Sequence, residues 1–91
     1  MSFQEEILEK PKTGVKEKYE NEIVVYNDDV NTFDHVIECL IHACDHEPLQ
    51  AEQCTFLIHY KGKCTVKSGP YEDLEPRCSK LLSAGLSAEI L

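Results

Sequence analysis

The residues of this chain that are best suited to form a binding site are three consecutive polar ones, Asn27, Asp28 and Asp29. They follow the short apolar run 23–26 and precede a segment with helical periodicity. Carbonyl and carboxylate oxygens at a strand end can accept the three hydrogen-bond donors of a protonated amine. The same residue types are also common in plain turns and helix starts. The triplet therefore indicates either an ordinary turn or a corner that binds a cation.

The charge around this triplet favours a cation over an anion. Residues 21–60 contain eight Asp or Glu and no Lys or Arg, and the whole chain carries a formal net charge of −8. Such a surface attracts cations and repels phosphate. Sequence-independent binding of nucleic acid requires a basic surface, so we expect no nucleic-acid partner.

The histidines allow two further interpretations. His59 is either a helix C-terminal histidine that interacts with the helix dipole, or a neutral imidazole that helps to hold a ligand amine. A zinc site is an alternative of a different class. Its candidate ligands would be Cys39, His42, His46 and either Cys44 or Cys54. No Cys-x-x-Cys pair completes it, so we expect neither metal nor cofactor.

Signals for an enzyme or for export are absent from the sequence. The chain has no Gly-x-Ser-x-Gly, no glycine loop for phosphate and no His-Glu-x-x-His. It also has no apolar run of 18 residues and no basic start followed by an apolar block. We therefore expect a non-enzymatic, cytoplasmic protein with no membrane partner. Its five cysteines are then expected to be reduced and to behave as small buried hydrophobes.

Two predicted helices must position these residues. After a strand at 23–26, the first helix is expected to start near Thr32, with Asn31 as its N-cap. Its buried face would hold Phe33, Val36, Ile37, Leu40, Ile41 and Cys44. The second helix is expected to start at Pro48 and to stop before Gly62. Its inward residues would be Ala51, Cys54, Thr55, Leu57 and Ile58.

The rest of the chain completes a small α/β domain. A strand is expected at 64–67, a turn at 68–70, a short helix around 74–82 and a closing strand at 86–91. The order β-α-α-β-α-β predicts an α/β (α+β) two-layer sandwich, in which a small three-stranded sheet packs on helices. Residues 1–21 are polar and mixed in charge, which predicts a flexible N-terminal tail with a helical turn at most near 5–9.

These motifs resemble those of the ClpS adaptor family. The resemblance rests on the Asn-Asp-Asp turn at 27–29, on Phe33-Asp34-His35-Val36-Ile37, on Ala51-Glu52-Gln53, and on Ile58-His59-Tyr60-Lys61-Gly62-Lys63. It covers residues 23–66 without gaps and is weaker from 67 to 91. It implies a ClpS-like domain at 22–91 behind an N-terminal extension at 1–21.

The resemblance also implies a function. Members of the ClpS family bind proteins with a destabilising N-terminal residue, such as Leu, Phe, Tyr or Trp, and deliver them to the N-domain of a Clp-family AAA+ unfoldase for degradation. By position, Asn27, Asp28 and His59 would contact the α-amino group, and Asp29 and Asn31 would shape the entrance and contact the peptide backbone. The side-chain pocket would be lined by Phe33, Val36, Thr55, Ile58 and Ala88.

Four features depart from the family pattern. Phe33 and Thr55 stand where the family usually has Met, and Ala88 stands where it has a pocket Leu. The third helix is also shorter than usual. Because Phe is rigid and Met is pliable, the preferred side chain is expected to shift. A ClpS-like interaction domain without an active pocket is therefore a further alternative.

Overall fold

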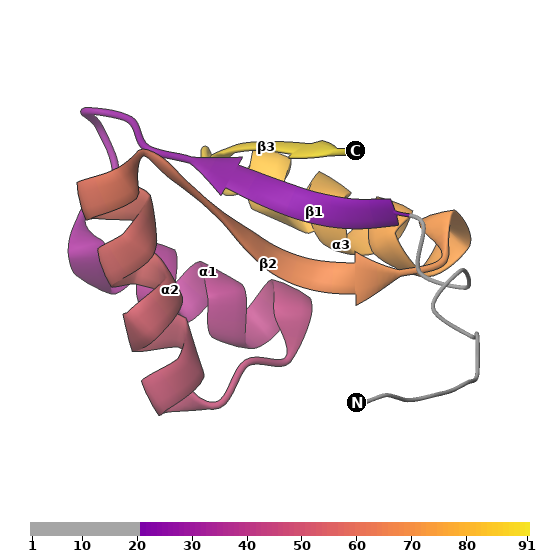
Figure 1. The fold of residues 1–91 in the computed structure, drawn as a ribbon, viewed down its shortest axis with the longest axis horizontal. Coiled ribbons are helices and arrows are strands. Elements are labelled where there is room, and N and C mark those ends of the chain that lie inside the picture. Colours follow the sequence, from indigo (N-terminus) through magenta and orange to yellow (C-terminus); the bar gives the residue numbers. More distant parts are fainter. Residues whose placement is uncertain (1–20) are drawn as a thin grey trace, which may run out of the picture.

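The computed structural model describes residues 21–91. Three helices and a three-stranded antiparallel sheet follow one another in the predicted order β-α-α-β-α-β (Figure 1). The sheet order is β2-β1-β3, so β1 (Asn21–Tyr26) lies between β2 (Lys63–Gly69) and β3 (Ser87–Ile90). The α+β sandwich predicted from the sequence is confirmed. The predicted tail and its helical turn near 5–9 lie outside the described residues.

One hydrophobic core joins the sheet to all three helices. From the sheet it takes Val66 of β2 and, from β1, Ile23 and Val25, which are alternate residues that share one face. The helices are α1 (Phe33–Cys44), α2 (Pro48–Lys61) and α3 (Tyr71–Ser83). Their buried contributions include Leu40 of α1, Ala51 and Ile58 of α2, and Leu74 and Leu81 of α3. In the described residues, no helix is long and apolar enough to cross a membrane.

The element boundaries differ from the predictions by a few residues. Strand β1 begins at Asn21, two residues before the start of the strand predicted at 23–26. Strand β2 extends through the predicted turn to Gly69, and α3 is 13 residues long rather than a short segment around 74–82. Long-range pairing explains the first two differences, because Asn21 pairs with Gly69 across the sheet.

Two local predictions on the helices are wrong. The N-cap of α1 is Thr32 and not Asn31, because the Thr32 hydroxyl accepts a hydrogen bond from the His35 backbone N–H at 3.1 Å. Leu57 does not face inward, since 45% of it is exposed. The helix buries a narrow stripe at Ala51, Thr55 and Ile58, and Leu57 lies beside it.

Two of the five cysteines, Cys44 and Cys78, are buried as expected, and Cys39, Cys54 and Cys64 are half-buried. All five in the described region are free thiols. Burial raises the pKa of Cys44 to about 11 and that of Cys54 to about 12. Because the thiolate is the reactive form, neither thiol is suited to nucleophilic chemistry.

Candidate functional site

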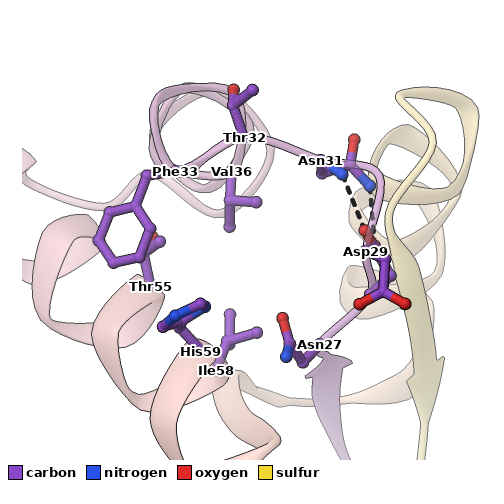
Figure 2. Close-up of a pocket in the computed structure, with 10 residues that line it drawn as sticks. Asn27, Asp29, Asn31, Thr32, Phe33, Val36, Thr55, Ile58 and His59 are labelled. Carbon is purple, nitrogen blue, oxygen red and sulfur yellow. Dashed lines mark hydrogen bonds between the residues drawn. The ribbon is translucent and has the colours of Figure 1, made fainter.

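A cavity of about 350 Å³ lies between the loop after β1, the start of α1 and the last turns of α2. Figure 2 shows its lining, with α2 and Phe33 on one side and the loop residues on the other. Nine of the ten site residues predicted from the sequence line it. They are Asn27, Asp28, Asp29, Asn31, Phe33, Val36, Thr55, Ile58 and His59. Residues 32 positions apart in the sequence thus meet around one opening.

Ala88 is the predicted pocket residue that lies elsewhere. It pairs with Val25 in β3 and lines a separate hollow beside α3, together with Tyr71 and Leu82. Its assignment to the cavity is wrong, because β3 runs away from the loop after β1. The residue of this segment that reaches the site is Gly85, just before the strand, whose carbonyl oxygen binds Asn31.

Thr32 is a lining residue that sequence reasoning did not assign to the pocket. It is also the N-cap of α1. The signal for it was present in the sequence, since Thr caps helices well and the residue at the cap lies at the junction of loop and helix. Because Asn31 was predicted to be the N-cap, Thr32 was not considered for this position.

The Asp28 carboxylate organises the loop. Its Oδ1 accepts a hydrogen bond from the Val30 backbone N–H at 2.8 Å. Asn31 donates two more, from its backbone N–H to Oδ1 and from Nδ2 to Oδ2, both at 2.8 Å (dashed lines in Figure 2). The backbone bond from Asn31, followed by its side-chain bond, lowers the pKa of Asp28 below its ordinary value of 3.8. Asp28 is therefore anionic at neutral pH and keeps part of its acceptor capacity for a ligand.

Asn31 ties this loop to a distant turn. Its Nδ2 donates both to Asp28 Oδ2 and to the carbonyl oxygen of Gly85, at 2.8 and 2.9 Å. Both side-chain N–H groups are thus engaged, so Asn31 can offer a ligand only its acceptor, Oδ1. The bond to Gly85 spans 54 residues and holds the rim of the cavity against the turn between α3 and β3.

The end of α2 fixes Asn27 relative to His59. Gly62 caps the helix with φ +94°, and its N–H donates to the Ile58 carbonyl at 3.0 Å. The Gly62 carbonyl then accepts a hydrogen bond from the Asn27 backbone N–H at 2.9 Å. His59 lies one turn before this cap, so one helix end sets the positions of both residues. Their side chains project toward the cavity from opposite sides (Figure 2).

The inner wall of the cavity is apolar, whereas its rim is polar. Val36 and Ile58 are 8% and 4% exposed and form part of the core. Thr55 is 2% exposed, and its hydroxyl donates to the Ala51 carbonyl at 2.7 Å, so this group needs no partner from a ligand. Among the described residues that line the cavity, none is Lys or Arg. The arrangement suits a ligand with an apolar body and a cationic end.

The proposed zinc ligands are not brought together. Within residues 21–91, no group of three or more His, Cys, Asp or Glu is placed to hold a metal. His46 lies after the end of α1, is buried, and binds the Val66 carbonyl oxygen through Nε2 at 2.7 Å. His42 is exposed and binds Glu38 on its own helix. The interpretation of these residues as one zinc site is therefore wrong.

Comparison with solved structures shows which known α/β domain shares this fold. The chain superposes on Agrobacterium tumefaciens ClpS2 bound to L-phenylalaninamide with a TM-score of 0.73, at 15% identity, over 81% of this chain and 96% of that one. At this identity the match establishes a shared fold.

Comparison of sequences gives the family. Residues 16–89 match the model for "ATP-dependent Clp protease adaptor protein ClpS". The ClpS adapter of Thermosynechococcus vestitus is 39% identical over 66 residues, which are 71% of this chain and 70% of the relative. That of Nostoc sp. is 37% identical over 81 residues, 87% and 84% respectively. The chain belongs to the ClpS family of Clp protease adaptors, as its motifs indicated.

Proposed function

We propose that this chain is a non-enzymatic adaptor that binds the N-terminal residue of a substrate protein and delivers that protein to the N-domain of a Clp-family AAA+ unfoldase. One observation carries the proposal. Asn27, Asp28 and His59 stand at the rim of a cavity whose wall is apolar and whose described lining has no competing cation. The related ClpS2 was solved with L-phenylalaninamide, a free amine with a large apolar side chain.

Each part of such a ligand has a complementary group. The ammonium group is a donor only, and Asn27 Oδ1, the Asp28 carboxylate and an unprotonated nitrogen of His59 are acceptors. The Asp29 carboxylate and Oδ1 of Asn31 are the acceptors proposed for the backbone N–H of the second substrate residue. Burying the side chain of a Leu or Phe against Phe33, Val36, Thr55 and Ile58 contributes about 1.5–3 kcal/mol.

These contributions favour reversible binding. A hydrogen bond to a charged group contributes roughly 1.5–3 kcal/mol. Ordering two flexible partners costs several kcal/mol in return, so a dissociation constant on the order of micromolar is expected. Such an affinity suits an adaptor that must release its cargo. The expected substrates are proteins with N-terminal Leu, Phe, Tyr or Trp, and the expected place of action is the cytoplasm.

Fluorescence anisotropy with short labelled peptides tests recognition. Peptides that differ only at residue one, as Leu, Phe, Tyr, Trp or Val, are compared with N-acetylated Leu. Micromolar binding of the large apolar set is expected, with at least a 10-fold loss on acetylation, because acetylation removes the cation and two donors. His59→Ala is expected to weaken binding by about 10-fold and to leave the unfolding midpoint nearly unchanged, since His59 is exposed. Binding of acetylated Leu at full affinity would contradict the proposal.

Delivery needs a second measurement. A reporter with N-terminal Leu is degraded by a purified Clp-family unfoldase and protease, with and without this chain. Acceleration is expected with the native chain. We also propose that the N-terminal extension acts only in delivery, as the family resemblance implies. A variant with residues 2–18 replaced by Gly and Ser is then expected to keep its affinity for peptides and to lose the acceleration. Equal acceleration by both proteins would refute that role.

A further inference from the structure

Four aromatic rings form a continuous row on the α2 side of the cavity. Phe33 contacts Phe56 and His59 edge to face, at centroid distances of 5.2 and 5.6 Å. Tyr60 stacks on Phe56 at 5.6 Å and meets His59 edge to face at 4.8 Å. Phe56, His59 and Tyr60 lie at i, i+3 and i+4 of one helix, which places them on one face. We call these four residues the aromatic row.

The row begins at the cavity and continues beyond it. Phe33 and His59 line the opening, as Figure 2 shows, whereas Phe56 and Tyr60 do not line it. Both outer rings reach the surface, with 44% of Phe56 and 70% of Tyr60 exposed. Binding in the cavity thus gives a role to Phe33 and His59 but leaves Phe56 and Tyr60 without one.

Exposed aromatic rings next to a cavity are suited to binding. Contiguous apolar surface beside a pocket is characteristic of ligand-binding grooves, and Tyr is enriched among the residues that dominate binding energy. Contacts between the rings also hold them in place. Binding a ligand there would therefore cost the protein little side-chain conformational entropy. The row therefore presents a rigid apolar platform that is continuous with the proposed peptide site.

We propose that the aromatic row is a second subsite, which takes a large apolar or aromatic side chain from residue two or three of the bound substrate. The inference rests on the proposed function, because it assumes that residue one occupies the cavity. Consecutive Cα atoms are about 3.8 Å apart, so residues two and three must cross the rim. In an extended chain, residue three points to the same side as residue one. Its side chain would therefore lie over the surface beside the opening, where Phe56 and Tyr60 are exposed.

The test uses peptides of one composition that differ only in order. Each starts with Leu and continues with Ser and a single Trp, placed at position two, three or six. An aromatic contact is worth a few-fold in affinity. We expect the peptide with Trp at two or three to bind about 3- to 10-fold more tightly than the peptide with Trp at six.

Variants of the row identify the contact. Tyr60→Ala and Phe56→Ala are expected to remove this preference and to make the peptides equal. Leu57→Ala is the matched control, because Leu57 lies beside Phe56 on α2 with 45% exposure but does not belong to the row. It is expected to retain the preference. The readout is the ratio between peptides, so a general loss of affinity through a shifted His59 does not imitate the result.

The outcomes separate the two proposals. Equal binding of all Trp positions by the native chain, with binding still lost on acetylation, would overturn the subsite and leave the adaptor function standing. A positional preference that survives both Tyr60→Ala and Phe56→Ala would also overturn it. If no peptide with a free N-terminus binds, the adaptor function fails and the subsite fails with it.

Discussion

At the scale of single residues, the site divides into groups that face the ligand and groups that hold the loop. Asn27 is exposed, and no described hydrogen bond occupies its side chain. Asn31 is half-buried and spends both of its N–H groups on Asp28 and Gly85. The two asparagines are four positions apart, yet their substitution should have different consequences.

Replacing each asparagine by Ala tests this division. Asn31→Ala is expected to lower the free energy of unfolding by about 1–2 kcal/mol, because it removes a part-buried hydrogen bond to Asp28 and an exposed one to Gly85. It should also weaken peptide binding. Asn27→Ala is expected to change stability by less than about 0.5 kcal/mol and to weaken binding alone. Urea denaturation and anisotropy measure the two effects. Equal stability of both variants would show that the link to Gly85 does not hold the loop.

At the scale of elements, the site depends on how α2 ends. Gly62 adopts a left-handed conformation with φ +94°, and a Cβ added there would meet no atom within 4 Å. Its carbonyl oxygen holds the Asn27 backbone. The requirement at this position is therefore conformational rather than steric, and the cap couples helix geometry to the rim of the cavity.

Substitution of Gly62 tests this coupling in graded form. Gly62→Ala is expected to destabilise the fold by about 1–2 kcal/mol, the cost of the left-handed region for a residue with a Cβ. Gly62→Asn should cost less, because Asn tolerates that region. Peptide affinity should fall in the same order. Thermal unfolding and anisotropy give both quantities, and exposed Lys61→Ala is the control. Full stability of Gly62→Ala would mean that the helix can end in another way.

At the scale of the whole molecule, two hydrogen-bonded carboxylates make the stability of the fold depend on pH. Asp28 orders the site loop, and Asp45 at the end of α1 binds Arg77 of α3 at 2.9 Å. Hydrogen bonds from Asn31 and from Arg77, respectively, lower the pKa of each below 3.8. The folded state thus binds fewer protons than the unfolded state in acid. The stability that they contribute is present above pH 3.8 and is lost as pH falls through their folded pKa values.

Acid unfolding measures this contribution. The free energy of unfolding is expected to decline below about pH 4. Asp28→Asn combined with Asp45→Asn should make that decline shallower. Asp29→Asn combined with Asp34→Asn removes the same charge where no side-chain hydrogen bond is described, and it should leave the decline as in the native chain. Urea titrations between pH 2 and 7 distinguish the two, and an identical pH dependence of both double variants would contradict the assignment.

The sequence by itself determined the elements and most of the site. Local signals were sufficient for the helices, because apolar periodicity, Pro48 and Gly62 act within one or two turns of chain. The residue types at 27–31 and at His59 also indicated acceptors at a strand end and at a helix end. These features need no knowledge of distant partners, so they could be read directly.

Only the tertiary structure decided what depends on distant pairing. The register of β3 against β1 placed Ala88 opposite Val25 and brought Gly85 to Asn31 instead. Helix packing brought Phe33 of α1 against Phe56 and formed the aromatic row. Packing of the buried His46 against β2, where its ring binds the Val66 carbonyl oxygen, also removed the zinc interpretation. Such contacts join residues that are 20 or more positions apart, and no local pattern in the sequence encodes which of them will meet.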